Sequence, residues 1–211
     1  IVCNGFKDDP YVEAVVLTAK LGRRILPVVE DLREAELLLE HARRHEVDVP
    51  MGVRVKLGAR GAGRWSGSAG EKSKFGLFAG EVLELVERLR DAGRLEALRL
   101  VHCHPGSQVQ DIRRLKDAVA ELAHFYAELR RLGAPVAYLD VGGGLGVDYD
   151  GTRTDAESSM NYTLEEYAGE VVYRVAEVCE ERGVPHPTIV SESGRTIAAY
   201  QRVLVFEAVG R

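Results

Sequence analysis

Short apolar runs rich in β-branched residues alternate with longer amphipathic stretches along the 211-residue chain. The runs are nearly continuously apolar rather than alternating, which is typical of parallel strands buried on both faces. They predict strands over Ile1–Asn4, Ile25–Glu30, Gly52–Leu57, Leu98–His104, Val136–Val141 and Thr188–Glu192.

The amphipathic stretches place leucine and alanine at helical spacing with charged residues between them. They predict helices over Leu32–His45, Gly80–Ala92, Ile112–Leu132 and Leu164–Arg182. Gly133 and Gly183 follow two of these stretches, each with a proline within two residues, and we expect both to end helices.

This alternation of strands and helices indicates βαβ units and an α/β fold. Such units fit either a doubly wound open sheet or most of a (β/α)₈ barrel, which takes about 250 residues and eight strands. The segment 1–201 therefore predicts about six of eight barrel units, and the apolar run near residues 202–211 predicts the start of another domain. Because both ends of the chain fall in apolar runs, we expect a fragment of a longer protein. The Gly- and Ser-rich stretch Gly58–Gly70 predicts one long loop.

The composition favours a partner that is neither nucleic acid nor membrane. The formal net charge is -5, with both signs spread along the chain and no basic cluster. The chain has no apolar run of the roughly 20 residues that cross a bilayer. Three well-separated cysteines favour a reducing, cytoplasmic setting over a disulfide framework.

Polar residues and glycines gather where the predicted strands end. His102–Gln108, Asp140–Gly146 and Ser191–Arg195 follow three neighbouring strands. Since ligands of parallel α/β folds bind at the carboxyl ends of strands, we expect these segments to form one site.

The run Gly142, Gly143 and Gly144 is open to two interpretations of equal weight. It is either a tight turn that needs positive φ or a set of free backbone N–H groups that binds an anion. Ser107 and Arg195 would add a hydroxyl and a guanidinium to the same anion. One phosphate monoester held by three loops is the simplest joint interpretation.

Glu192 and His104 indicate which phosphate ester this is. A carboxylate pairs with a protonated ring nitrogen and an imidazole stacks on a flat ring, and pyridoxal phosphate offers both features. Alternatively, Glu192 forms a surface ion pair with Arg195, or His102 and His104 bind zinc as a His-x-His pair, for which no third ligand is evident. Cys103 is expected to be a buried small apolar side chain.

Two basic residues need separate consideration. Arg54 is either an interior arginine paired with an acid or a donor to the ring hydroxyl of the cofactor, with Lys56 on the same side of a regular strand. Lys7 is a tempting candidate for the lysine that a pyridoxal enzyme requires. It lies in a turn-like segment, and we interpret it as an ordinary loop or helix-start residue.

Several motifs together resemble a known family of enzymes, the biosynthetic arginine decarboxylases, which use pyridoxal phosphate and share an alanine-racemase-like (β/α)₈ barrel with a separate β-domain. These motifs are Asn4–Asp8, Glu71–Leu77, His104–Gln108, Asp140–Tyr149 and Ser191–Arg195. The resemblance runs from Ile1 to about Gly210. Ser193 stands where relatives acting on ornithine or diaminopimelate usually have proline, and Pro105 departs from the aliphatic residue usual in the family.

The resemblance implies catalytic roles for His104 and Glu192, with His104 stacked on the pyridine ring and Glu192 paired with its nitrogen. It implies that Ser107, Gly142–Gly144 and the segment Ser193, Gly194 and Arg195 bind the phosphate, with Arg54 near the ring hydroxyl. It also implies magnesium as a second cofactor, a dimer or tetramer, and a cofactor-binding lysine that precedes this chain. The fragment would then be inactive alone.

The implied reaction is decarboxylation of L-arginine to agmatine and carbon dioxide, a step in polyamine and spermidine synthesis. The alternatives are a related decarboxylase of diaminopimelate or ornithine, a non-catalytic relative that binds pyridoxal phosphate, and a metal-dependent barrel hydrolase that uses His102 and His104.

Overall fold

Six parallel strands form one sheet in the computed structural model, which describes residues 1–58, 73–201, 205 and 207. The strands are β1 (Val2–Cys3), β2 (Leu26–Val29), β3 (Met51–Arg54), β4 (Leu98–His102), β5 (Tyr138–Asp140) and β6 (Thr188–Val190). The helices are α1 (Asp9–Lys20), α2 (Leu32–Arg44), α3 (Ala79–Asp91), α4 (Ile112–Arg131), α5 (Leu164–Arg182) and α6 (Gly194–Ala198), with short 3₁₀ turns at Leu95–Ala97 and Ala199–Gln201.

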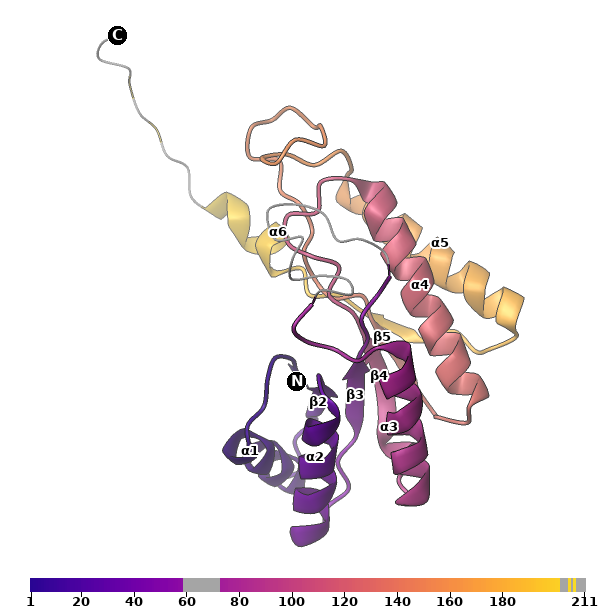
Figure 1. The fold of residues 1–211 in the computed structure, drawn as a ribbon. Helices are drawn as coiled ribbons and strands as arrows, with labels where there is room; N and C mark the ends of the chain where they lie inside the picture. Colours follow the sequence, from indigo (N-terminus) through magenta and orange to yellow (C-terminus); the bar gives the residue numbers. More distant parts are fainter. Residues whose placement is uncertain (59–72, 202–204, 206, 208–211) are drawn as a thin grey trace.

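The strand order decides between the two predicted architectures. Neighbours in the sequence are neighbours in the sheet, in the order β1-β2-β3-β4-β5-β6. A doubly wound sheet reverses its order at a switch point, whereas a barrel wall keeps the order sequential. With right-handed connections this order puts the helices on one face of the sheet (Figure 1). The described part is therefore a partial barrel wall, and the count of eight units stays a prediction.

The wall is curved so that its first and last strands approach each other. The side-chain amide of Asn4, just after β1, donates a hydrogen bond to the carboxylate of Glu192, just after β6. Val2 of β1 and Val190 of β6 also line one hollow of about 590 Å³. This curvature brings the two edge strands of the sheet, β1 and β6, close together.

The predicted elements agree with the structure except near the first helix. All six strands are observed, and each is shorter than predicted, so that His104 and Glu192 lie in the loops beyond β4 and β6. Gly133 and Gly183 end α4 and α5 with φ of 90° and 64°, as predicted. Helix α1 is absent from the predicted elements, although Asp8 caps it and Pro10 occupies its first turn, where no N–H is needed.

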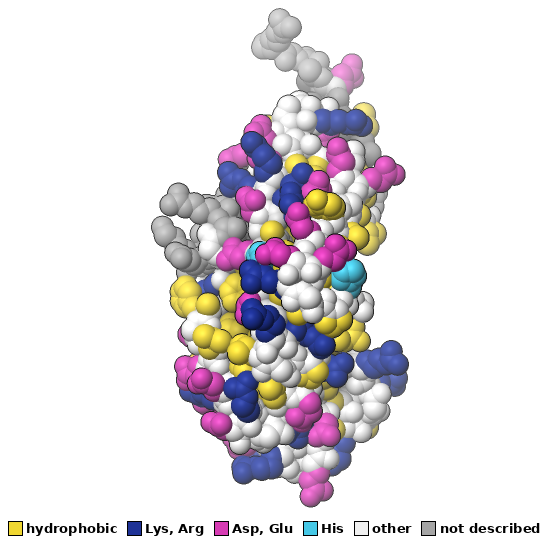
Figure 2. Space-filling model, turned by 90° about the vertical axis from the view of Figure 1, so that its right-hand side faces the viewer, with side chains coloured by type: hydrophobic (Ala, Val, Ile, Leu, Met, Phe, Trp, Pro, Cys, Tyr) yellow, Lys and Arg dark blue, Asp and Glu magenta, His cyan; other side chains and the backbone are white. Residues whose placement is uncertain are grey.

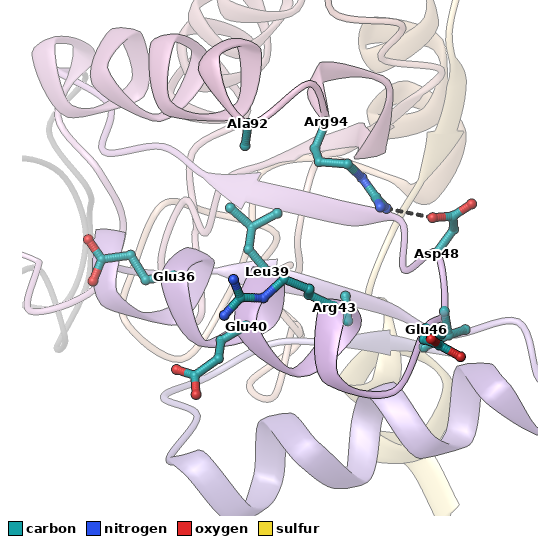
Figure 3. A pocket seen from close by; sticks show the side chains of 10 residues that line it. Glu36, Leu39, Glu40, Arg43, Glu46, Asp48, Ala92 and Arg94 are labelled. Carbon is teal, nitrogen blue, oxygen red and sulfur yellow. Dashed lines mark ion pairs between the residues drawn. The ribbon is translucent and has the colours of Figure 1, made fainter.

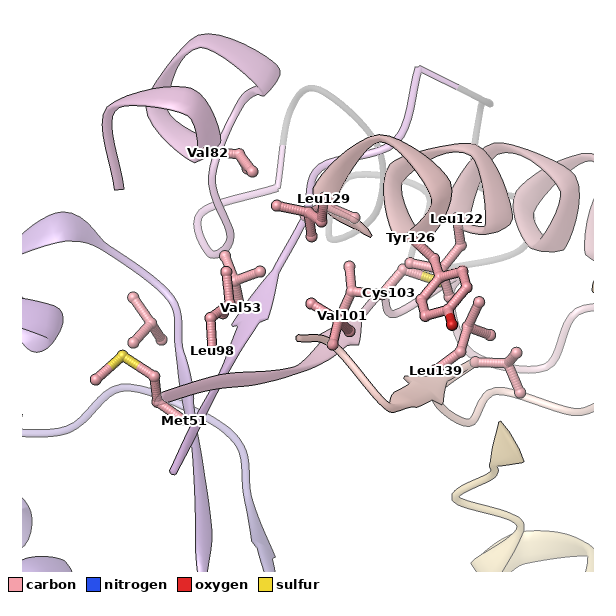
Figure 4. Packing of buried hydrophobic residues seen from close by; sticks show 14 of the residues in the cluster. Met51, Val53, Val82, Leu98, Val101, Cys103, Leu122, Tyr126, Leu129 and Leu139 are labelled. Atoms are coloured by element: carbon pink, nitrogen blue, oxygen red, sulfur yellow. The ribbon is translucent and has the colours of Figure 1, made fainter. Parts of the chain in front are cut away.

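The core lies between the sheet and the helices. Val101, Cys103 and Leu139 point from the strand side toward Leu122 and Tyr126 of α4 (Figure 4). Tyr126 is fully buried and its hydroxyl donates to the carbonyl of Pro185 at 2.6 Å, which ties α4 to the segment before β6. Cys103 is 1% exposed, so its predicted role as a small buried side chain is confirmed.

The outer surface carries charges of both signs. Figure 2 shows Lys and Arg side chains interspersed with Asp and Glu on the face it draws. Among the helices of the described part, none combines the length and apolar character needed to cross a membrane. The predicted loop Gly58–Gly70, beyond Gly58, and the predicted domain start at 202–211, apart from Val205 and Glu207, lie outside the described residues.

Lys7 differs from the ordinary loop residue that the sequence predicts. Its side chain is fully buried, and its ammonium lies 3.0 Å from the Glu34 carboxylate. It also donates to the carbonyl oxygens of Gly5 and Val28. Glu34 in turn accepts the backbone N–H groups of Lys7 and Glu30 at 2.9 and 2.8 Å. The pair therefore joins the loop after β1 to the end of β2 and to α2.

Replacing Lys7 by methionine should destabilise the protein strongly. Removal of one partner of a buried pair leaves the other charge uncompensated, at a cost of about 3–5 kcal/mol. The matched control is Lys116→Met, because Lys116 pairs with Glu170 with both side chains about one-third exposed, and such pairs contribute roughly 0–1 kcal/mol. Denaturant unfolding measures both changes, and equal effects would contradict the structural role of Lys7.

Candidate active site

A cavity of about 270 Å³ lies at the carboxyl ends of β4, β5 and β6. It is lined by Thr196 and by residues of the three predicted strand-end segments: His104, Gly106, Ser107, Gly143, Gly144, Leu145, Glu192, Ser193, Gly194 and Arg195. Eight of the ten predicted site residues are in this lining. Gly142 and Arg54 are not.

The three glycines allow the backbones of the three loops to touch. A Cβ on Gly142 would lie 2.2 Å from the Cys103 carbonyl oxygen, and one on Gly144 would lie 2.0 Å from that of Gly106. Gly143 has ordinary φ, yet its Cβ would lie 2.6 Å from the carbonyl oxygen of Glu192. Positive φ, 68° at Gly142 and 86° at Gly144, adds a second reason at these two positions. Steric exclusion is therefore sufficient to explain this glycine run.

The same loops leave hydrogen-bond donors at the cavity. Among the described residues, none accepts a hydrogen bond from the backbone N–H of Gly143 or Gly144. The Arg195 guanidinium lies beside them and donates to Ser107 Oγ at 2.9 Å and to Gln108 Oε1 at 3.1 Å. Two free amides, a hydroxyl and a guanidinium in one small cavity make a donor set suited to a phosphate.

Gln108 holds this donor set in place, a role that was not predicted from the sequence. It adopts φ of 53°, which is unusual for a residue with a side chain. Its amide donates to the Val147 carbonyl at 2.7 Å, and its Oε1 accepts from the Val147 N–H at 3.0 Å and from Arg195. Its position inside the motif His104–Gln108 was the available signal, but only the structure shows its partners.

Glu192 is placed by Asn4 and not by Arg195. Its carboxylate accepts from the Asn4 side chain, and Arg195 instead binds Ser107 and Gln108, so the alternative of a Glu192–Arg195 ion pair is wrong. Although the residue as a whole is exposed, its carboxyl end lies near His102 and Asp140. Burial, followed by the negative charge of Asp140, raises the pKa of the Glu192 carboxyl, while His102 acts in the opposite direction.

A row of charged side chains crosses the inner face of the sheet beneath the cavity. Arg54, His102 and Asp140 are register partners on β3, β4 and β5. Glu30, after β2, accepts from Arg54 at 3.0 Å and from the Gly5 N–H at 2.6 Å. Asp140 lies 3.1 Å from Nδ1 of His102 without hydrogen-bond alignment, and its other oxygen accepts the Gly142 N–H. Arg54 is thus an interior arginine paired with an acid, one of its two predicted interpretations.

The environment of His104 favours the neutral form of its imidazole. Burial, then the positive charges of Arg54 and His102, lower the pKa of its imidazole. A neutral ring is a flat, weakly hydrated surface, which suits stacking on another ring.

The structure groups His102 with other candidate metal ligands than the predicted zinc pair. One ligand atom each from His102, Asp140 and Glu192 lie within 4.8 Å of one another, and His104 is not in this group. Among the described residues, the predicted His102–His104 pair has no third ligand, and His102 lies instead beside Asp140 and Glu192.

A larger hollow of about 670 Å³ lies between α2 and α3, away from the strand ends (Figure 3). Figure 3 shows the ion pair between Arg94 and Asp48, 2.9 Å long, at one end of it. Two of its carboxylates, Glu36 and Glu40, pair with arginines outside the lining, and it contains none of the strand-end residues. Size alone therefore does not identify the site.

Comparison with known proteins defines the class. The family described as "Pyridoxal-dependent decarboxylase, pyridoxal binding domain" matches residues 1–199, so the chain belongs to this family of pyridoxal-dependent decarboxylases. The predicted family and its pyridoxal cofactor are confirmed.

Particular relatives are similar over the whole chain. The chain is 53% identical to the biosynthetic arginine decarboxylase of Rhodopirellula baltica and 49% identical to that of Salmonella paratyphi B, covering 100% of this chain but 31% and 33% of theirs. The crystal structure of biosynthetic arginine decarboxylase from Campylobacter jejuni matches 94% of this chain and 32% of that one, with a TM-score of 0.82 and 35% identity. The chain thus spans about a third of the length of these relatives.

Substitution of Gly144 by alanine should disrupt the site. Gly151 is the matched control, because it has φ of 75° and no atom within 4 Å of an added Cβ. Gly151→Ala should lose about 1–2 kcal/mol from left-handed strain, and Gly144→Ala should lose about 1–3 kcal/mol more from the clash with Gly106. Denaturant unfolding compares the free energies of unfolding of the two variants. Equal losses would mean that the loop of Gly106 moves away from the added Cβ at no energetic cost.

The pKa of His104 should respond to Arg54. Histidine NMR titration should place this pKa below its ordinary 6.5, and Arg54→Met should raise it because one positive charge is removed. Lys56→Gln is the control: Lys56 lies over the Phe78 ring and is not among the groups that shift His104. An unchanged pKa in Arg54→Met would remove Arg54 from the causes and leave burial and His102.

Proposed function

We propose that this chain is the cofactor-binding part of a decarboxylase that converts L-arginine to agmatine and carbon dioxide, with pyridoxal phosphate as cofactor, in polyamine synthesis. The observation that carries the proposal is the convergence beside Glu192 of Ser107, Arg195 and the N–H groups of Gly143 and Gly144, for which the described part of the chain offers no acceptor. Relatives 53% and 49% identical that bear the name biosynthetic arginine decarboxylase support the substrate.

The phosphate is bound by residues of three loops. Ser107 donates its hydroxyl, Arg195 donates from its guanidinium, and the amides of Gly143 and Gly144 complete the donors. Gln108 and Ser107 already hold Arg195 in position, so little side-chain entropy is lost on binding.

The other residues act on the ring. Pyridoxal phosphate, when bound, supplies a protonated ring that accepts the electrons released as carbon dioxide leaves. Glu192 holds the proton at the ring nitrogen, and Asn4 orients its carboxylate. The imidazole of His104 would stack on the ring. Arg54, held by Glu30, would donate to the ring hydroxyl.

The family resemblance places the lysine that binds the cofactor outside this chain, and the structure removes Lys7 as a candidate. Lys7 is fully buried and engaged by Glu34, Gly5 and Val28, so its amine is not available. The longer protein would supply this lysine, the residues that recognise arginine, and the partner subunit of a dimer or tetramer.

Diaminopimelate is the second candidate substrate class. A Helicobacter pylori diaminopimelate decarboxylase has the same fold, with a TM-score of 0.76 at 24% identity. Ser193, in place of the proline usual in that group, favours arginine.

Agmatine formation tests the substrate directly. The full-length protein and this 211-residue chain, each supplied with pyridoxal phosphate, are incubated with arginine, ornithine and diaminopimelate, and the products are measured by mass spectrometry. We expect agmatine from the full-length protein and no turnover by the chain alone. Turnover of ornithine or diaminopimelate in place of arginine would retain the family and reject the substrate. Turnover by the chain alone would show that one of its own lysines binds the cofactor.

Phosphate binding by Arg195 can be tested separately from turnover. Arg195→Gln in the full-length protein should weaken pyridoxal phosphate about 10-fold or more, since a charge-assisted hydrogen bond contributes roughly 1.5–3 kcal/mol. It should leave the affinity for pyridoxal, which lacks the phosphate, unchanged. Arg153→Gln, at an exposed loop position, is the control. Equal weakening of both ligands would remove Arg195 from the phosphate site.

A further inference from the structure

A second cluster of ligand-type side chains lies between α1 and α2, on elements that contribute nothing to the cavity. Asp9 and Glu13 are four residues apart on α1, and His41 on α2 is four residues before His45, the residue that caps the C-terminus of α2. Residues at this spacing lie on one face of a helix. The two helices pack so that the acidic pair meets the histidine pair.

The distances within this cluster are close to those of a tetrahedral metal site. Oε1 of Glu13 lies 3.1 Å from Nε2 of His45 and 4.0 Å from Nδ1 of His41. One ligand atom from each of the three residues lies within 4.8 Å of the other two. Zinc bonds of 2.0–2.2 Å place tetrahedral ligand atoms roughly 3.4 Å apart, so small side-chain rotations would complete the geometry.

His41 provides the independent observation. It is 1% exposed, and its Nδ1 is buried with no hydrogen-bond partner among the described residues. Its Nε2 lies 2.9 Å from a carboxylate oxygen of Asp9. The Asp9 carboxylate accepts a hydrogen bond from the N–H at Nε2 of His41. The lone pair of the imidazole is then at Nδ1 and points toward Glu13. Metal-binding histidines are commonly oriented by a carboxylate in this way.

A pair of protonated histidines explains the cluster less well. A charged His41 would donate from Nδ1, but its acceptor at 4.0 Å is beyond hydrogen-bond distance. The two imidazole rings are also stacked, with centroids 6.2 Å apart and planes 8° from parallel. Two positive charges would repel in this arrangement, whereas two neutral rings can share one cation.

We propose that Glu13, His41 and His45 bind one divalent cation of the zinc class, with Asp9 orienting His41 and water in the remaining position. Two imidazoles and one carboxylate suit zinc better than magnesium or calcium, which prefer oxygen ligands. The cation joins α1 to α2 and stabilises the folded state, because the unfolded chain does not hold the three ligands together.

Titration of the metal-free, full-length protein with zinc chloride tests the proposal. Calorimetry should detect one zinc equivalent that is lost in Glu13→Gln and His45→Ala, both partly exposed positions where folding should survive. Asp9→Asn should weaken zinc about 10–100-fold. Cobalt added in place of zinc should give the visible absorption of a tetrahedral ion, and magnesium should not compete. Glu40→Gln and His186→Ala, at exposed or partly exposed positions outside the cluster, should bind as the unsubstituted protein does.

Two results would overturn the site. Zinc affinity that is unchanged in both Glu13→Gln and His45→Ala would place any bound zinc elsewhere. Absence of zinc binding to the metal-free protein would make the cluster a set of hydrogen bonds and ion pairs between α1 and α2. Neither measurement depends on turnover. The proposed zinc site can therefore be rejected while the proposed decarboxylase activity is confirmed, and the activity can be rejected while the zinc site is confirmed.

Discussion

The close approach of three backbone segments at the ends of β4, β5 and β6 is the constraint on which the candidate site depends. Carbonyl oxygens of Cys103, Gly106 and Glu192 occupy the positions where side chains of the glycine run would stand. No other residue type permits this contact without displacing a loop. The contact sets how far Ser107 lies from Arg195 and where Glu192 enters the cavity. The chemistry is therefore positioned by main-chain packing, and the side chains follow from it.

Charged residues inside the sheet are stable here because each has a partner in register or one strand away. Glu30 satisfies Arg54 and the Gly5 amide, and Asp140 lies against His102 and holds the Gly142 amide. A buried charge without such partners would cost several kcal/mol. Asp140 has both a structural and an electrostatic effect. It fixes the turn that starts the glycine run, and its negative charge raises the pKa of Glu192.

Local patterns were enough to predict the strands, the four long helices and the residues that line the cavity. The strands and helices follow from hydrophobic periodicity and glycine caps, which are local features of the sequence. The cavity residues follow from the polar and glycine clusters at the strand ends and from the family resemblance. Helix α1 was missed because its valines favour strand and Pro10 resembles a turn. The partners of Lys7, Arg54 and Gln108 were out of reach for a different reason. Each contacts residues from another strand or helix, and only the strand order determines which ones meet.

Asn4 and Glu192 are 188 positions apart in the chain, yet they share a hydrogen bond at the site. Closing so long a loop is among the last steps that a folding chain can complete, because its entropy is recovered only when the intervening strands are paired. A chain that has assembled only part of the wall would have the glycine run and the phosphate donors but a carboxylate without its orienting amide. The affinity of the site for the ring nitrogen of the cofactor would then depend on whether the wall is complete. Binding of the cofactor would draw the population toward chains whose first and last strands have met.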